Sequence, residues 1–278
     1  MAASLALLVA VGCGGAPPPA QPEWTKPVAT DGAQPPFAAP GERVRYRVSA
    51  YNVELASMQL AVGDVTELEG KKAIVIQATA QSEGLAARVK PVTLELTSWL
   101  DVANGQPLLF RAVETAGKDD ATVEQVDARF TQLANKLLPI AVSHPSTPTE
   151  PEKLEQQVIT NEPHELLGTL FLLRTWDDKP GTTRTFDTVR SKFMWRLQAT
   201  IIGREVIPTE LGELPALKIE AVNRRLMRDG SLDKGTEART FTVWISDDAD
   251  RVPLRMVAES DYGNVTLDIA DYTAGNPL

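Results

Sequence analysis

The chain is short of the side chains on which most metal and covalent sites depend. It has one cysteine and two histidines among 278 residues. A single cysteine excludes an internal disulfide and a thiolate cage for a metal. His144 and His164 leave little for zinc binding or histidine-based catalysis, and no Gly-x-Ser-x-Gly elbow is present. We therefore expect no cofactor, no metal and no enzymatic activity.

Positive charge is also scarce. The chain has 28 Lys and Arg against 37 Asp and Glu, which gives a net charge of -9 and a pI near 4.9. An acidic chain repels phosphate backbones, so we expect no nucleic-acid partner. We also find no cluster of basic residues that would suit an anionic membrane surface. Aromatic residues make up only 6%, but 43% of the chain is hydrophobic, which is ordinary for a globular protein.

The only cysteine lies where a lipid anchor would be attached. Ser4–Val11 is apolar, but it is shorter than the roughly 20 residues that span a bilayer, and it fits the core of a signal peptide. The following Ala10-Val11-Gly12-Cys13 resembles a bacterial lipobox. We therefore predict a signal peptide over residues 1–12 and lipidation of Cys13. The alternative is a buried cysteine in a helix, which the prolines that follow disfavour.

Residues 13–40 have the composition of a tether. Eight prolines lie between positions 16 and 40, and such a segment is extended and cannot pack a core. We expect it to be disordered and to hold the rest of the protein away from a membrane. Gly14 is not the aspartate that often retains lipoproteins at the inner membrane. The expected location is therefore the cell envelope, on the periplasmic face of the outer membrane in a Gram-negative bacterium.

Period-two alternation dominates from Gly41 onward. In Arg43–Ala50 the apolar side chains occupy every second position, and three arginines lie on the other side. That pattern predicts a half-buried strand. We interpret the arginines as a solvated strand face in preference to an anion site. Similar runs recur to residue 273, and we expect about ten to twelve strands. We predict a single β-rich domain over 41–273, with two halves joined by a loop at 143–152.

One segment, about Pro163 to Trp176, has the pattern of a helix. Asn161 is a suitable N-cap, and Pro180-Gly181 would end the helix. The segment is apolar almost all round, so it should be buried. The predicted fold is mainly β: a large curved antiparallel sheet, either a half-barrel or a split sheet, packed on this one apolar helix.

Two groups of residues are candidates for a site. A concave sheet could form a hydrophobic pocket, and its lining would be Leu166, Leu170, Phe171, Trp195 and Trp244. For the tryptophans we favour an ordinary core or sheet-face role.

The second group is an acidic cluster. Asp247, Asp248 and Asp250 could hold calcium, which prefers oxygen ligands. The cluster lacks the ligand spacing of an EF-hand, and we interpret it as a polar turn between strands. On that interpretation, Asp248→Ala should change stability little.

Several motifs in the C-terminal half resemble a known family. They are Gly203–Val206, Leu211–Ile219, Trp244–Arg255 and Tyr262–Val265, together with the helix Glu165–Arg174 followed by Pro180-Gly181. In this order they are similar to domain-of-unknown-function family 3108, a family of bacterial exported proteins, over about Gly41 to Tyr272. The resemblance implies an exported, β-rich domain and supplies no catalytic residue.

Three functions remain open at this point. The first is a non-enzymatic envelope lipoprotein that is held at the membrane by its acyl anchor and binds or scaffolds an envelope protein, polysaccharide or lipid. The second is a carrier for a lipid or another hydrophobic ligand in the concave pocket. The third is a cell-wall hydrolase that uses two carboxylates facing one cleft.

Overall fold

The computed structural model describes residues 38–118, 121–145, 149–158, 162–176, 179–260 and 263–276. The first half of the chain forms eight strands, with one short helix and one 3-10 turn between them. These elements are β1 (Arg43–Ala50), β2 (Val53–Leu68), β3 (Lys71–Ser82), α1 (Gly84–Val89), β4 (Val92–Asp101), β5 (Pro107–Ala116), β6 (Thr122–Arg129), η1 (Phe130–Gln132), β7 (Leu137–Ser143) and β8 (Glu152–Gln157).

The second half begins with a two-residue strand and a helix and then returns to strands. Its elements are β9 (His164–Glu165), α2 (Leu166–Arg174), β10 (Thr183–Arg190), β11 (Phe193–Thr209), β12 (Gly212–Arg225), β13 (Arg239–Ser246), β14 (Pro253–Ser260) and β15 (Gly263–Thr273). Fifteen described strands exceed the expected ten to twelve, partly because β9 has only two residues, too few for alternation to predict it.

All fifteen strands belong to one sheet. Its order is β8-β7-β6-β5-β4-β3-β2-β1-β15-β14-β13-β12-β11-β10-β9. Each half is a meander, and the first strand pairs with the last, β1 with β15, to join the halves. Every pairing is antiparallel except that of β9 with β10, which is parallel. The sheet is therefore mixed, whereas the sequence predicted only antiparallel pairs.

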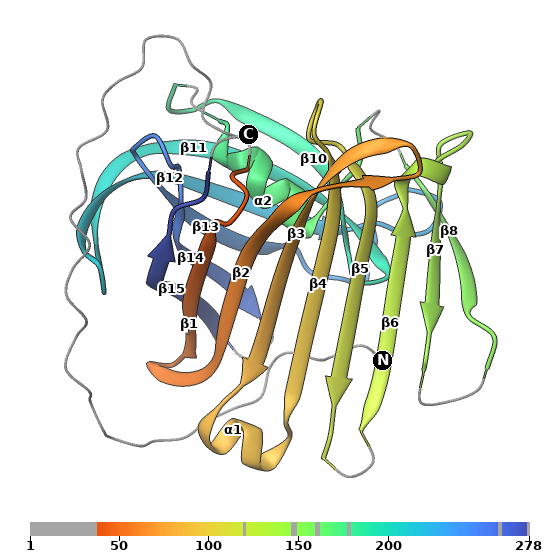
Figure 1. Ribbon diagram of the computed structural model, residues 1–278, viewed down its shortest axis with the longest axis horizontal. Coiled ribbons are helices and arrows are strands. Elements are labelled where there is room, and N and C mark those ends of the chain that lie inside the picture. Colours follow the sequence, from red (N-terminus) through yellow and green to blue (C-terminus); the bar gives the residue numbers. More distant parts are fainter. Residues whose placement is uncertain are drawn as a thin grey trace.

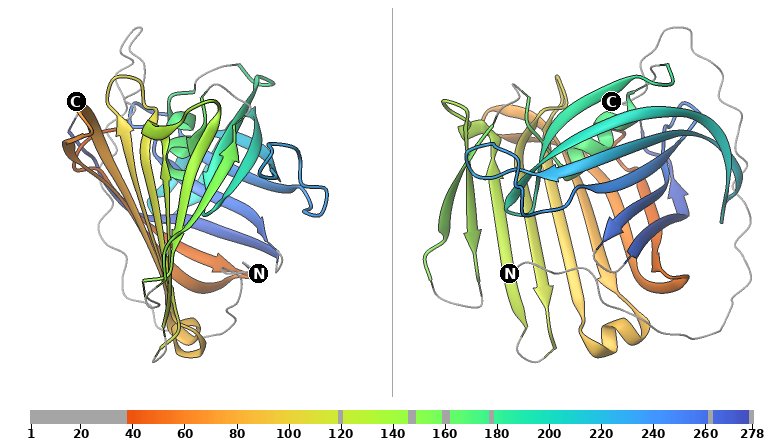
Figure 2. Two further views of the ribbon diagram at one scale, coloured as in Figure 1. Left: turned by 90° about the vertical axis from the view of Figure 1, so that its right-hand side faces the viewer. Right: turned by 180° about the vertical axis from the view of Figure 1, so that it is seen from behind.

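The sheet curls around α2, as expected for so many twisted strands. Figure 1 shows β1–β8 as one leaf, with the second leaf crossing behind it, and Figure 2 shows α2 between the leaves. The helix packs against β4 and β10. Leu167 and Phe171 of α2 join the larger hydrophobic cluster, while Leu173 and Trp176 join a second cluster on β10–β13. The predicted mainly β fold, with a curved sheet packed on an apolar helix, is confirmed.

The helix starts later than predicted. It spans Leu166–Arg174 and not 163–176, because the backbone at Glu165 is extended and pairs with β10. The N-cap is Glu165, whose carboxylate accepts hydrogen bonds from the backbone N–H groups of Leu167 and Gly168. Asn161, the predicted cap, lies outside the described residues. The sequence favoured Asn161 because asparagine is a common cap, but the short strand β9 displaces the helix start.

The domain boundary also moves slightly. Ala38 is buried in the core, and the carbonyl of Pro40 accepts a hydrogen bond from the backbone of Asn276 at 2.8 Å. Residues 38–40 therefore belong to the domain and not to the tether. Cys13 and the rest of the predicted signal peptide and tether lie outside the described residues, so their roles stay predictions. Within the described ranges, no helix is long and apolar enough to cross a membrane.

The alternation predicted for the first strand is confirmed. Val44, Tyr46 and Val48 are buried, and the three arginines between Arg43 and Arg47 are exposed. Arg45 lies 3.6 Å from Asp271, and Arg47 lies 3.6 Å from Glu54. Carboxylates thus already neutralise much of this strand face, which fits a solvated surface.

Candidate functional site

The C-terminus of α2 ends in a buried ion pair. Arg174 donates from Nη1 to Glu42 Oε2 at 3.0 Å, and its Nη2 lies 3.0 Å from Oε1. The two side chains are 2% and 1% exposed. Burial raises the pKa of Glu42, and the Arg174 charge opposes that shift. Because both groups are inside the core, the pair fastens the helix end to the segment before β1.

The acidic turn lies beside this ion pair. Asp248 Oδ1 accepts hydrogen bonds from the hydroxyl of Ser246 at 2.7 Å and from the backbone N–H groups of Asp250 and Arg251 at 3.1 and 3.0 Å. Asp247 contacts Arg204 at 2.9 Å and Arg251 at 3.4 Å. Within the part of the chain that the structure describes, no three His, Cys, Asp or Glu side chains gather to hold a metal. The hydrogen bonds are those of a capped turn.

The five predicted pocket residues are not gathered in one place. Phe171 is fully buried, Leu170 packs between the two hydrophobic clusters, and Leu166 is 38% exposed. Trp195 is paired across the sheet with Arg225, and Trp244 with Lys218. Positions 218 and 225 on β12 point to opposite faces, so the tryptophans do too. Trp195 and Trp244 therefore do not line one pocket on the same face of the sheet.

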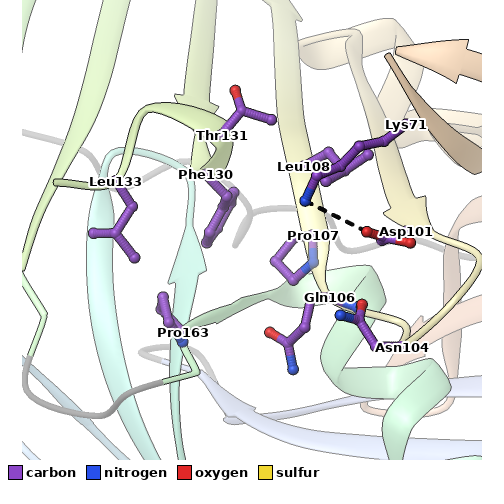
Figure 3. Close-up of a pocket in the computed structure, with 10 residues that line it drawn as sticks. All are labelled: Lys71, Asp101, Asn104, Gln106, Pro107, Leu108, Phe130, Thr131, Leu133 and Pro163. Carbon is purple, nitrogen blue, oxygen red and sulfur yellow. Dashed lines mark hydrogen bonds and ion pairs between the residues drawn. The ribbon is translucent and has the colours of Figure 1, made fainter. Parts of the chain in front are cut away.

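One cavity of about 180 Å³ opens at the ends of β4 and β5 (Figure 3). Lys71 and Asp101 form an ion pair of 3.5 Å across it. The rest of its lining is mixed: Asn104, Gln106, Pro107, Leu108, Phe130, Thr131, Leu133 and Pro163. It is smaller than the roughly 300–1,000 Å³ of typical ligand pockets, and a charged pair occupies its wall.

A second cavity, of about 270 Å³, gathers three carboxylates. Glu54, Glu210 and Asp268 line it with Arg47, Ser49 and Asn52. Arg47 lies 2.5 Å from Glu210 and 3.6 Å from Glu54, and Arg255 pairs with Asp268. Each carboxylate therefore already has a cationic partner. This arrangement suits a surface ion-pair network better than proton transfer to a substrate.

The start of α2 holds two buried titratable groups. Burial raises the pKa of Glu165 to about 7, although the hydrogen bonds that its carboxylate accepts from the backbone N–H groups of Leu167 and Gly168 oppose this shift. His164 is 4% exposed, and burial lowers its pKa. Its ring lies edge-on to Phe186 at 5.9 Å. Both groups lie under the sheet in the core, so they act on the helix start and not on a solvent-facing substrate.

A cluster of cations and aromatic rings lies on β10–β13. The cross-strand partners Arg190↔Phe193 and Trp195↔Arg225 place four of its side chains on one sheet face. Arg239 joins them, because it pairs with Asn223, two residues before Arg225. Arg228 follows β12. We call these residues the arginine–aromatic face: Arg190, Phe193, Trp195, Arg225, Arg228 and Arg239.

The contacts within this face are cation–π contacts. The guanidinium carbon of Arg225 lies 4.8 Å from the Phe193 ring centre, that of Arg228 lies 5.9 Å from it, and that of Arg190 lies 6.0 Å from the Trp195 ring. Asp233 pairs with Arg225, and its Oδ2 accepts from Nε at 2.6 Å. Asp233 thus neutralises Arg225 within this face.

The surroundings of Arg190 and Arg228 in the arginine–aromatic face disfavour the charged form of their side chains. Surrounding protein atoms and the nearby Arg239 charge both lower the pKa of Arg190, although part of its side chain stays exposed. Burial lowers the pKa of Arg228, and Glu152 opposes that shift. Trp195 Nε1 and Arg228 Nη1 are two buried donors that no acceptor in the described part of the chain satisfies.

No cluster of basic residues in the sequence predicted this face. Its cations are spread over fifty positions, from Arg190 to Arg239, and are brought together only by strand pairing. A local signal did exist. Arg224-Arg225 and Arg228 lie close together in an acidic chain, and aromatic Phe193 and Trp195 alternate on the neighbouring strand.

The curled sheet around one helix places this protein among barrel-like β proteins with an open sheet. A β-barrel-like protein of domain-of-unknown-function family 1849 from Brucella abortus superposes with a TM-score of 0.52 at 7% identity, covering 86% of this chain and 97% of that one. The likeness concerns the fold alone.

The sequence identifies the family. Residues 45–270 match the family described as "Protein of unknown function (DUF3108)", so the chain belongs to that family. The resemblance seen in the motifs is thus confirmed.

Two further solved structures have lower TM-scores. A protein from Bacteroides fragilis with a YmcC-like fold, described as exported, has a TM-score of 0.39 at 8% identity and covers 87% of this chain and 100% of that one. A protein from Parabacteroides distasonis described as a lipoprotein has 0.36 at 9% identity, with coverage of 87% and 100%. No protein with a curated description matches the sequence.

Proposed function

We propose that this protein is a non-enzymatic, lipid-anchored protein of the bacterial cell envelope that binds or scaffolds another envelope component. The observation that carries the proposal is the use of the concave interior: α2 fills it, with Phe171 fully buried and Leu167 only 2% exposed. An interior filled by the protein's own helix leaves the outer surfaces for binding. The carrier alternative has less support, because it needs this space to be empty.

The hydrolase alternative also has less support. It needs two carboxylates free to exchange protons and attack a substrate in one cleft. Glu54 and Glu210 do face one cavity, but both lie within ion-pair distance of Arg47.

The anchor is tested by metabolic labelling with a clickable palmitate. We expect label on the wild-type chain and none on Cys13→Ala, with the wild type in the outer-membrane fraction and the variant in the periplasm of a Gram-negative host. Equal labelling of the two chains would contradict the anchor.

Binding is tested separately from anchoring. The full chain with Cys13→Ala is mixed with washed, protein-free envelope fragments and sedimented at increasing concentration. Saturable sedimentation is expected. A linear, unsaturable signal equal to that of an unrelated acidic protein would contradict the proposed binding function.

A further inference from the structure

The cavity at the ends of β4 and β5 has two unlike sides. Figure 3 shows Phe130, Leu133 and Pro163 on one side and the ion pair of Lys71 and Asp101 on the other. The first side is apolar and includes an aromatic ring, and the second is polar. A small ligand that lies between them must therefore present C–H groups to one side and hydrogen-bonding groups to the other.

Three polar side chains of this cavity have hydrogen-bonding capacity to spare. Within the described residues, the side chains of Gln106 and Thr131 form no hydrogen bond. Asn104 uses only its Oδ1, which accepts from the backbone N–H of Gln106 at 2.9 Å. A side-chain amide both donates and accepts, and so does a hydroxyl group. These side chains can therefore pair with several hydroxyl groups of one ligand.

The charges that line the cavity balance each other. Lys71 Nζ lies 3.5 Å from Asp101 Oδ2, and no other charged residue is among the described residues of the lining. A lining with no net charge attracts neither anions nor cations from solution. It therefore favours a neutral ligand, to which Lys71 can still donate and from which Asp101 can still accept.

Backbone hydrogen bonds fix both sides of the cavity. In the turn between β4 and β5, Asp101 N–H donates to the carbonyl of Gln106 at 2.8 Å, and Gly105 N–H donates to the carbonyl of Asp101 at 2.7 Å. On the apolar side, Leu133 N–H donates to the carbonyl of Phe130 at 3.1 Å. A site that is formed in advance loses little conformational entropy on binding, which matters most for a small ligand.

We propose that this cavity binds one neutral pyranose unit of an envelope polysaccharide. The C–H groups on a face of the sugar ring pack on Phe130, and its hydroxyl groups pair with Asn104, Gln106 and Thr131. The cavity volume of about 180 Å³ equals that of about six water molecules, which is the scale of a single ring and not of a lipid chain. This inference rests on the proposed binding function, because it names the class of component bound.

The second cavity lacks this combination of sides. None of its described lining residues is apolar, and its carboxylates are paired with Arg47 and Arg255. It therefore offers no surface on which a sugar ring could pack.

NMR spectroscopy tests the site directly. The full chain with Cys13→Ala is labelled with ¹⁵N, and the methyl glycosides of glucose, mannose, galactose and N-acetylglucosamine are added separately, up to tens of millimolar. We expect at least one sugar to cause saturable shifts of amide signals, centred on residues 101–108 and 130–133. The absence of saturable shifts in these two segments with all of the sugars would overturn the inference.

Variants test the two sides of the cavity separately. Gln106→Ala or Thr131→Val removes hydrogen bonds and Phe130→Leu removes the ring, and each should weaken binding of the sugar by about three- to tenfold. The matched control is Gln77→Ala, which removes the same amide from an exposed position of β3 outside the cavity and should bind like the parent chain. Equal weakening in all of the variants, or in none, would overturn the site.

Salt and charged sugars test the neutrality of the ligand. Affinity for the neutral sugar should be the same at low and high ionic strength, because no net charge is screened. Tighter binding of glucosamine or glucuronate than of every neutral sugar would overturn the inference. Saturable sedimentation of the Cys13→Ala chain with envelope fragments, without a response to any of the sugars, would refute this site and leave the proposed binding function standing.

Discussion

The side chains of Arg174 and Arg251 each donate a hydrogen bond to the other residue's backbone carbonyl, 77 positions apart in the chain. Arg174 Nε donates to the carbonyl of Arg251 at 3.0 Å, and Arg251 Nε donates to the carbonyl of Arg174 at 3.2 Å. Arg251 also donates to the carbonyl of Trp176 at 2.7 Å. These bonds satisfy carbonyls at the end of α2 that the helix itself leaves open. Buried charge is tolerated here because almost every polar atom has a partner.

The first prediction concerns the buried ion pair. Arg174→Met should lower the free energy of unfolding by about 3–5 kcal/mol, because it leaves Glu42 charged or protonated in the core without its partner. The control is Arg45→Met, which removes an exposed pair with Asp271 and should cost less than about 1 kcal/mol. Urea unfolding followed by circular dichroism measures both. Equal losses for the two variants would contradict the structural role of Arg174.

The acidic turn leads to a second prediction, which departs from the expectation that Asp248→Ala changes stability little. Asp248 Oδ1 accepts three hydrogen bonds, and one of them positions the backbone of Arg251. Losing this cap should cost about 1–3 kcal/mol. Asp248→Asn keeps an acceptor and should cost clearly less in the same urea titration. A negligible loss of free energy of unfolding for Asp248→Ala would contradict this prediction and show that Asp248 is an ordinary turn residue.

Glu165 gives a prediction about pH. Its pKa is raised from 4.5 to about 7 in the folded protein, so between these pH values the folded state binds more protons than the unfolded chain. Stability from this group is therefore fully present below about pH 4.5 and is lost as pH rises to about 7, a change of roughly 3 kcal/mol. His164 acts in the opposite direction, because its lowered pKa makes acidification unfavourable.

The measurement for Glu165 is a comparison of two chains. Urea unfolding at several pH values between 4 and 8 is recorded for the wild type and for Glu165→Gln, which keeps an acceptor for the helix cap and cannot titrate. Subtracting the two cancels the contribution of His164. The free energy of unfolding of the wild type minus that of Glu165→Gln should fall as pH rises. A difference that is constant with pH would refute the prediction.

At the scale of the element, α2 joins the two leaves because its sides contact different parts of the sheet. Phe171 packs into the larger cluster and Leu173 into the cluster on β10–β13. Gly168 is needed at the first turn: a Cβ there would lie 2.6 Å from Glu165 Oε1 and 3.3 Å from Leu100. The helix is short, so packing and caps stabilise it more than its own propensity does.

Truncation of α2 side chains tests this packing. Phe171→Ala should lower the free energy of unfolding by about 3–5 kcal/mol, because it leaves a cavity between the helix and the sheet. Leu166, 38% exposed at the start of the same helix, is the matched control, and Leu166→Ala should cost under about 1 kcal/mol. Similar costs at the two positions in a urea titration would show that the helix does not fill the interior.

At the scale of the whole molecule, the pairing of β1 with β15 joins the ends of the domain. This closure makes contacts between the earliest and latest strands, and the two leaves share one large hydrophobic cluster. Residues from β1 to β7 and from β14 and β15 contribute to it. A shared core of this kind should unfold as a unit.

Cooperative unfolding tests the prediction of a single domain. Hydrogen exchange across a urea titration should give the same midpoint for β3–β5 and for β11–β13, with the tryptophan fluorescence transition at that midpoint as well. Removing β15 by ending the chain after Ser260 should abolish both transitions. Two separate midpoints in the intact chain would mean that the leaves are independent units.

Alternation in the sequence determined most of the strands and the buried face of each, because side chains on a pleated strand point to opposite sides regardless of the partner strand. It also determined that one apolar helix is buried. The family could also be recognised from the sequence, because its motifs are local and do not depend on which strands pair.

Only the tertiary structure decided which residues from distant parts of the chain come into contact. The parallel β9–β10 pair set the start of α2, and Glu42 met Arg174 across 132 positions. The arginine–aromatic face likewise arises from the register of four consecutive strands, β10 to β13. The exact register of each pair and the long-range pairing of β1 with β15 depend on the packing of the whole sheet, which the alternation of a single strand does not specify.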